Sequence, residues 1–551
     1  MVGLVSIGLL LLASAAPVPV PPPPPAVSTA ERNQAIQFAH MIHNLGVQVR
    51  REHLAEPELK NLIAGAVRGL YDEAGVKVPD EVLQAVNRAG ENSSELVSLL
   101  ADARIRLGNI PALSGPRALF AAANGFKHAT DPYCGLASHR VNTVISVDMD
   151  FGIGLELDGV SGQRWSIFRM ERAAAIGQLP ATGFFGPLPK PDAVPSPASF
   201  PWRIKRIIPG SPAQKAGVKP GDTITHLNGE EITAENANRL FVRFAEPPGV
   251  AFDPNTGQPL PLKRTFKLKR AKVEKPIDLT LETQRYEPEA VFGVMRTSDT
   301  KWDCMLDRQD KIGYIRIGPI EEGSDAKLGD MLDDLTKQGC RALILDLRWC
   351  PGGYVTPGTR MAGMFLKPDT IIAQVQAKRD GKGGLNPLPE VYRATAPFAG
   401  RFLGTPVLVL VGSETTGGGE LIAAALQDNN RCETMGQRTV GRAAIQFPME
   451  AGFGQLQFKV TTGATLRPNG KPRGKLPDSK PTDDWGIKPD PGLEVPITAD
   501  MSTKLRLWAE EHTLRPADSL EAMPFDDPMK DPYRAAALAH LRKQLMRKIA
   551  N

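Results

Sequence analysis

Three hydroxyl side chains stand just ahead of three glycines in the stretch SETTGGGELIAAALQD, residues 413–428. The hydroxyls belong to Ser413, Thr415 and Thr416, and the apolar run Val407–Val411 precedes them. A strand that turns sharply into a helix is a common mount for a nucleophile or for a bound anion. The pattern therefore predicts a strand-to-helix junction at which one of these hydroxyls could do chemistry.

A second glycine turn follows another apolar strand, in ALILDLRWCPGGYV, residues 342–355. The strand runs into Asp346-Leu347-Arg348, and Pro351-Gly352-Gly353 then turns the chain. Glycine lets a backbone amide point into a cleft, which is what an oxyanion hole requires. Gly353 is therefore a candidate oxyanion-binding residue, although a plain tight turn would be favoured if this were the only clue.

A third motif points to peptide binding. The run Gly152, Ile153, Gly154, Leu155 can present backbone N–H groups to a carboxylate, and the adjoining strand edge can accept an extended peptide. The later block SPAQKAGVKPGDTITHLNG, residues 211–229, resembles PDZ domains, in which the helix expected over 234–244 would flank the peptide groove. The alternative is a structural β-module with a closed groove.

The elements that must position these motifs alternate between strands and helices after residue 311. Such alternation predicts an α/β fold with a largely parallel sheet. The expected strands are 312–317, 341–347, 370–375 and 407–411, and the expected helices are 324–338, 357–366 and 420–427.

The rest of the chain divides by composition and periodicity. An apolar segment ending in Ala13-Ser14-Ala15 predicts an export signal over residues 1–15, and the Pro-rich residues 16–30 predict an extended spacer. The remaining expected regions are a helical N-terminal region (31–140), a PDZ-like domain with a Pro-rich insert (141–285), the α/β core (286–500) and a C-terminal helical extension (501–551), whose helix over 531–548 is expected to be an exposed terminal cap.

Composition excludes several classes of function. The chain has 551 residues, enough for several domains, with 42% hydrophobic and 23% charged residues, as in ordinary globular proteins. A net charge of +5 does not indicate a nucleic-acid-binding surface. Five cysteines without a CxxC motif and eight unclustered histidines favour neither a disulfide scaffold nor a metal centre, so we expect no cofactor.

The order of the motifs resembles the C-terminal processing (tail-specific) serine peptidases. The resemblance rests on KIGYIRI, LILDLR followed by PGG, GGELIAAALQDN, and G-x-x-T-x-G-x-x-x-x-Q at 436–446, with the PDZ-like block upstream. TDPYCGL, TTGATLRPNG and DDWGIKPD extend it over residues 118–496. The resemblance implies a crotonase-like peptidase core and a Ser/Lys dyad, in which a lysine held neutral by burial removes the serine proton.

Both dyad positions differ from the family pattern. The family serine stands three residues before the glutamate that opens the helix, which places it at Gly417. The family lysine stands four residues before a glutamine, which places it at Arg442 ahead of Gln446. The resemblance also implies oxyanion amides at Gly353 and at the residue after the nucleophile.

Three interpretations follow. The nucleophile has moved to Ser413, Thr415 or Thr416 with another group as base; the fold is kept and catalysis is lost; or the alignment is shifted by one residue, which puts Thr416 in the place of the serine. The resemblance implies an exported tail-specific serine peptidase homologue, in the periplasm or outside the cell, that binds protein or peptide C-termini. The alternative is a non-catalytic peptide-binding scaffold. Neither nucleic acid nor a stable membrane span is expected.

Overall fold

A computed structural model describes residues 28–136, 151–160, 200–208, 210–245, 260–286, 289–298, 301–377, 390–452, 456–475, 479–513 and 530–550. The expected export signal, most of the Pro-rich spacer and the Pro-rich insert lie outside the described residues. Within the described ranges, no helix combines the length and the apolar composition needed to cross a membrane.

The N-terminal region is helical, as predicted. It contains α1 (Thr29–Glu52), α2 (Leu59–Ala74), α3 (Asp80–Ala89), α4 (Ser93–Leu107) and α5 (Arg117–Gly125). Ser28 and Glu31 form a capping box that starts α1. Helices α2 and α5 pack so closely that a Cβ on Gly69 would lie only 2.2 Å from the Ala121 carbonyl oxygen.

The PDZ-like domain is built around one antiparallel sheet in the order β3-β4-β5-β7-β8. The strands are β3 (Leu155–Leu157), β4 (Trp202–Ile207), β5 (Thr223–Leu227), β7 (Lys263–Lys269) and β8 (Ile277–Glu282), with the helices α7 (Pro212–Lys215) and α8 (Ala237–Ala245). Trp202 packs on Phe241 and Phe244 of α8 to form the centre of its core. Strand β3 lies at the edge of this sheet.

The α/β core contains a sheet in the order β10-β14-β15-β18-β19, whose last four strands are parallel, as predicted. The strands are β10 (Val291–Phe292), β14 (Ile312–Ile317), β15 (Ala342–Asp346), β18 (Val407–Val411) and β19 (Cys432–Gly436). Helices α9 (Ser324–Lys337), α10 (Val355–Gly363) and α11 (Gly418–Asp428) accompany it.

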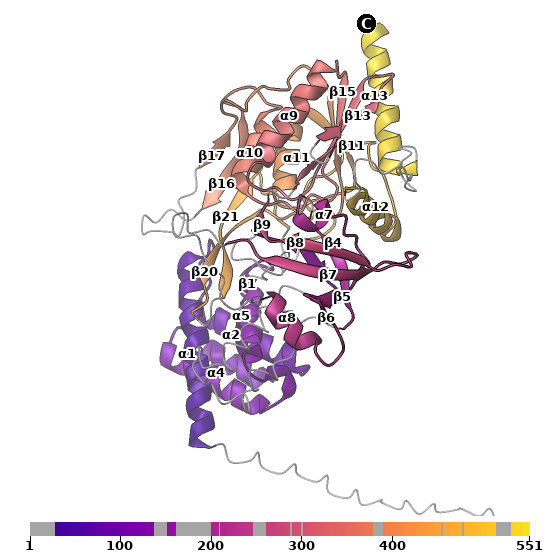
Figure 1. Cartoon of the computed structure of the whole chain (residues 1–551). Helices are drawn as coiled ribbons and strands as arrows, with labels where there is room; N and C mark the ends of the chain where they lie inside the picture. The colour runs from indigo at the N-terminus through magenta and orange to yellow at the C-terminus, as the bar shows by residue number, and fades with distance from the viewer. Residues whose placement is uncertain are drawn as a thin grey trace, which may run out of the picture.

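A second sheet joins the core to the N-terminal helices (Figure 1). It contains β1 (Gly135–Leu136), β16 (Ile371–Ala377), β17 (Val391–Arg393), β20 (Ala444–Glu450) and β21 (Gln457–Leu466). Strand β21 pairs with β1, and its residues Phe458 and Val460 are buried among the N-terminal helices. This second sheet therefore contributes side chains to the hydrophobic core of the N-terminal helices.

The parallel sheet is covered on both faces, which explains its uninterrupted apolar strands. Leu345 and Val409 pack toward α9, α10 and α11, whereas Ile344 and Leu408 pack toward the C-terminal helices α12 (Ala499–Thr513) and α13 (Pro532–Ala550). The expectation that the last helix is an exposed cap is therefore wrong. Leu538 and Leu541 of α13 are only 2% and 1% exposed, because they cover the second face of the sheet.

Candidate functional site

The strand-to-helix junction has a distinctive backbone at Gly417, the residue before α11. Its φ of 55° and ψ of −112° form a conformation that residues with a side chain rarely adopt. A Cβ at this position would lie 3.6 Å from the Gly352 Cα and 3.7 Å from the Pro351 oxygen, both ordinary contacts. The turn therefore has room for a small side chain at Gly417, and it carries none.

The PGG turn lies directly against this junction. A Cβ on Gly353 would lie 2.0 Å from the Ile320 oxygen, and one on Gly352 would lie 2.7 Å from the Gly418 nitrogen, so this close packing requires glycine. The Gly353 nitrogen is 3.7 Å from the position of a Cβ on Gly418. In the described part of the chain, the Gly353 N–H has no acceptor. This N–H is therefore a donor that could bind an oxyanion.

Glu420, on the first turn of α11, accepts backbone N–H groups from both expected dyad positions, Gly417 and Arg442. Its Oε2 accepts the N–H of Gly417 at 3.1 Å and that of Arg442 at 2.7 Å. Its Oε1 accepts the Gly441 N–H at 2.6 Å and the Thr439 hydroxyl. The Glu420 side chain is fully buried and also pairs with Arg473 at 3.3 Å, so its charge is compensated.

Arg442 occupies the expected lysine position with its side chain already engaged. Its Nη2 donates to the Gln446 Oε1, and its guanidinium carbon lies 4.7 Å from the centre of the Tyr133 ring. Gln446 in turn donates to the Tyr133 carbonyl at 2.6 Å. The structure therefore brings Gly417, Arg442 and Gln446 together, but a guanidinium stays protonated and cannot act as a base.

The three hydroxyl candidates occupy different environments. Thr415 is fully buried, and its hydroxyl donates to the Leu347 carbonyl at 2.8 Å and accepts the Gly412 N–H at 2.9 Å, which is a structural role. Ser413 is exposed at the turn. The Thr416 Oγ1 is buried and has no hydrogen-bond partner in the described ranges. The positive φ lies at Gly417 and not at Thr416.

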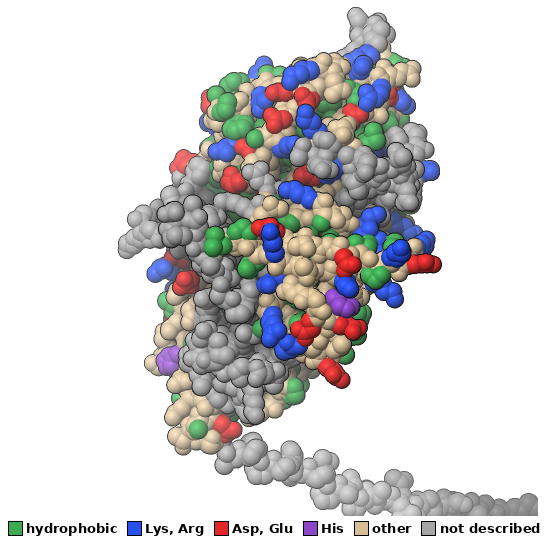
Figure 2. All heavy atoms as spheres, viewed as in Figure 1, with side chains coloured by type: hydrophobic (Ala, Val, Ile, Leu, Met, Phe, Trp, Pro, Cys, Tyr) green, Lys and Arg blue, Asp and Glu red, His purple; other side chains and the backbone are tan. Residues whose placement is uncertain are grey.

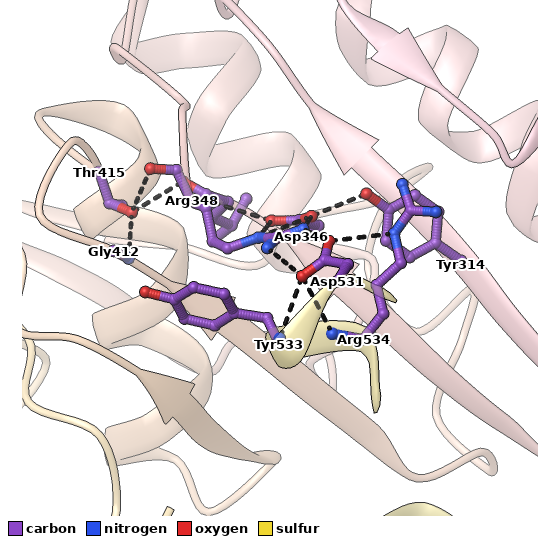
Figure 3. A network of polar contacts seen from close by, with 9 residues as sticks. Tyr314, Asp346, Arg348, Gly412, Thr415, Asp531, Tyr533 and Arg534 are labelled. Carbon is purple, nitrogen blue, oxygen red and sulfur yellow. Dashed lines mark hydrogen bonds and ion pairs between the residues drawn. The ribbon is translucent and has the colours of Figure 1, made fainter. Parts of the chain in front are cut away.

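A buried ion-pair network surrounds Arg348, which precedes the PGG turn in the sequence (Figure 3). Arg348 lies between Asp346, at 2.6 Å, and Asp531, at 2.8 Å. Burial opposes its charge, but the two carboxylates outweigh burial and raise the pKa of Arg348 well above its ordinary value. Tyr314 donates to Asp346 at 2.7 Å, and burial raises the pKa of this tyrosine to about 12.

Asp531 belongs to this network from a distant part of the sequence. Its Oδ1 accepts the Tyr533 N–H at 3.0 Å, so the same carboxylate caps α13 and pairs with Arg348. The Arg348 guanidinium is thereby tied to the helix that covers the sheet. Sequence reasoning missed Asp531, Glu420 and Tyr133 as supporting residues, and only the Asp-Pro turn before α13 signalled a helix start.

One group within the described ranges has donor atoms close enough for a metal: His53, Asp131 and Cys134. The His53 Nε2 lies 3.1 Å from the Asp131 Oδ2, and the Cys134 sulfur lies 3.3 Å from it. The Ala55 N–H, however, donates to the His53 Nδ1 at 3.1 Å. This contact places the proton of the neutral imidazole on Nε2, the nitrogen that would have to bind a metal. The three residues therefore fit a hydrogen-bonded cluster better than a metal centre.

The predicted peptide-binding loop precedes the edge strand β3. Ile153 and Leu155 are buried in the core of the PDZ-like domain. The carbonyls of Ile153 and Gly154 accept N–H groups of Ala213 and Ile208, each at 2.9 Å, whereas the N–H groups of Ile153 and Gly154 have no acceptor among the described residues. Gly152 pairs with Gln284 across the short β2 (Phe151–Gly152) and β9 (Gln284–Arg285).

We expect Glu420→Gln to lower the free energy of unfolding by about 2 kcal/mol, because the charged acceptor is lost and an amide NH₂ then faces backbone donors. Urea unfolding followed by circular dichroism measures this change. The control is Glu450→Gln at an exposed position, which should change stability little. Equal stability of the two variants would contradict the central role of Glu420.

Comparisons with known proteins agree with this architecture. Residues 311–490 match peptidase family S41, and residues 203–240 match the PDZ domain. The chain is 29% identical over 294 residues to the carboxy-terminal processing protease CtpA of Bacillus subtilis, covering 53% of each chain. It is 28% identical over 304 residues to the carboxyl-terminal-processing protease of Synechocystis, covering 55% of this chain and 61% of that one.

The chain thus matches only about half to three fifths of the length of these two relatives. A solved photosystem II D1 C-terminal processing protease aligns with 85% of this chain and 94% of its own, at 17% identity and a TM-score of 0.35. A similarity this low adds nothing to the assignment, which rests on the two matched regions.

Proposed function

Because this chain carries the peptidase family S41 core and the PDZ domain of the C-terminal processing serine peptidases, we propose that it captures protein C-termini without cleaving them by Ser/Lys chemistry. The observation that carries the proposal is the pairing of Gly417 and Arg442 on the Glu420 carboxylate. One carboxylate links the two positions, and neither position carries the reactive side chain that the family pattern calls for.

The chemistry of the replacements supports the loss of cleavage. Glycine offers no nucleophile, and arginine cannot take a proton from a hydroxyl at ordinary pH. Among the neighbouring hydroxyls, Thr415 is committed to backbone contacts and Ser413 is exposed at the turn. The site therefore lacks the activated nucleophile that acyl transfer requires.

One observation favours a second candidate, a serine-type peptidase with a relocated nucleophile. The Thr416 Oγ1 is buried, has no hydrogen-bond partner in the described part of the chain, and directly precedes Gly417. A substrate that brought its own base, or a base outside the described residues, would be needed to activate it. Cleavage that disappears in Thr416→Ala would establish this alternative.

The PDZ-like loop supports the binding half of the proposal. Its two N–H groups at Ile153 and Gly154 lack acceptors among the described residues, and β3 lies at a sheet edge. A peptide that adds as a strand to β3 would bring its terminal carboxylate to these N–H groups. The predicted partners are therefore proteins or peptides with a free, apolar C-terminus.

We expect a fluorescent peptide ending in three apolar residues to bind at least about tenfold more tightly as the free acid than as the C-terminal amide, since hydrogen bonds to a charged group contribute about 1.5–3 kcal/mol. Fluorescence anisotropy measures both affinities. Mass spectrometry of the recovered peptide should find it intact. Equal affinities would remove carboxylate capture, and a released fragment would contradict the loss of cleavage.

A further inference from the structure

Positive charge is concentrated in one segment of the PDZ-like domain. Residues 263–275, KRTFKLKRAKVEK, contain seven Lys and Arg side chains and one Glu, while the whole chain has a net charge of only +5. The segment consists of β7 and the turn that leads into β8. We call residues 267–275 the basic hairpin.

Not all of these charges are available to a partner. Arg270 is held by Asp222 at 2.8 Å, and Lys263 lies 3.8 Å from Glu282. Lys269, Lys272 and Lys275 are exposed, and in the described ranges none of them has an ion-pair partner. The free charge therefore gathers toward the tip of the hairpin.

Neighbouring strands extend this charge across the end of the sheet. The β ladder places Arg203 opposite Thr223, and Thr223 opposite Lys269, in one row of side chains outside the core. Lys219 is also exposed, and its N–H bonds to the Asp222 carboxylate that holds Arg270. Lys and Arg side chains gather at this projecting end of the PDZ-like domain (Figures 1 and 2).

The tip combines these charges with an aliphatic side chain. Val273, between Lys272 and Glu274, is 43% exposed. The basic hairpin contains no aromatic residue, and Phe266, just before it, is buried. A convex knob without exposed aromatic rings offers no stacking platform for nucleic acid bases. The tip also carries the exposed Glu274, but its three lysines leave it net positive. Such a tip instead suits the headgroup layer of an anionic bilayer, where each lysine near the surface strengthens binding.

We propose that the basic hairpin is a docking surface for an anionic lipid bilayer. The surface consists of Lys269, Lys272, Val273 and Lys275 at the tip, with Lys219 behind them. Arg203 lies beside these residues, but its charge is partly offset by Asp158 at 3.9 Å. The peptide-binding strand β3 is at the opposite edge of the same sheet, so docking leaves that edge free.

Sedimentation of the full chain with vesicles tests this proposal. We expect binding to phosphatidylcholine vesicles that contain 30% phosphatidylglycerol, none to pure phosphatidylcholine, and a steep loss of binding as salt rises. The variant Lys269→Glu/Lys272→Glu/Lys275→Glu should bind the anionic vesicles at least about 100-fold more weakly, at about fivefold for each lysine lost. Val273→Ser should reduce binding a few-fold.

A matched control separates the hairpin from net charge. Lys77→Glu/Lys337→Glu/Lys367→Glu makes the same charge change at exposed positions in other regions and should bind as the unmodified chain does. Circular dichroism confirms that each variant is folded. Equal losses in both triple variants, no binding to anionic vesicles, or hairpin-dependent binding to polyglutamate in place of vesicles would overturn the proposal.

Discussion

The variant Gly417→Ser/Arg442→Lys should cleave an unstructured polypeptide with an apolar C-terminus that the unmodified protein leaves intact. The turn at Gly417 has room for a Cβ, with its nearest neighbours at 3.6 and 3.7 Å. Its conformation, φ 55° and ψ −112°, is the strained kind in which a nucleophile is presented. A serine there would follow a backbone that is already in place.

A lysine at position 442 would be attached to a backbone that a hydrogen bond to Glu420 already holds in place. Its N–H would remain on Glu420, and Gln446 would remain within reach as an acceptor. Unlike arginine, lysine can lose its proton when it is buried, and can then serve as the base. A positioned general base contributes about 10²–10⁴-fold, so we expect the double variant to exceed the unmodified protein by at least about 10²-fold.

Release of a quenched fluorescent fragment measures this gain. The control variant is Gly417→Ala/Arg442→Lys, which carries the same backbone change and base but no hydroxyl, and it should be inactive. Gly417→Ser alone should also be inactive, because Arg442 cannot accept a proton. Cleavage by the unmodified protein, or equal activity in the alanine control, would show that another residue does the chemistry.

Replacing Asp531 by alanine should lower the free energy of unfolding by about 3–5 kcal/mol, since it removes one partner of a buried ion pair. Asp531 and Arg348 are 0% and 2% exposed in their side chains and are joined at 2.8 Å. The variant also loses the side-chain cap of α13. The remaining Asp346 offsets only part of the Arg348 charge.

Denaturant unfolding of three variants separates these contributions. Asp531→Asn retains a capping side chain but not the charge, so it should fall between the unmodified chain and Asp531→Ala. The control Asp500→Ala removes an acid with a 73% exposed side chain, paired with Lys504 in α12, and should change stability by less than about 1 kcal/mol. An Asp531→Ala variant as stable as this control would refute the network's contribution.

Much of the core could be predicted because its pattern is local. The strand Val407–Val411 and the parallel sheet follow from continuous apolar runs bounded by glycine and proline. Gly417 and Glu420, which are joined by a hydrogen bond at the start of α11, are also only three residues apart in the sequence. Motif spacing was therefore sufficient to place the junction.

The supporting contacts could not be predicted, because their partners lie far apart in the sequence. Gln446 bonds Tyr133 across 313 positions, and Arg348 bonds Asp531 across 183. A single charged residue carries no local sign of which opposite charge it will meet. The burial of α13 was missed for the same reason, since the spacing of apolar residues in a helix does not indicate which other element the helix packs against.

The place of α13 also affects how the chain is made. A ribosome synthesises all strands of the parallel sheet before residues 532–550, so Ile344, Leu408 and Leu410 emerge without the helix that covers them. Until then the nascent sheet exposes an apolar face of the kind that chaperones bind. This face of the sheet can be covered fully only after synthesis has passed α13, so a protein stopped short of residue 531 should be handled by the cell as an unfinished fold.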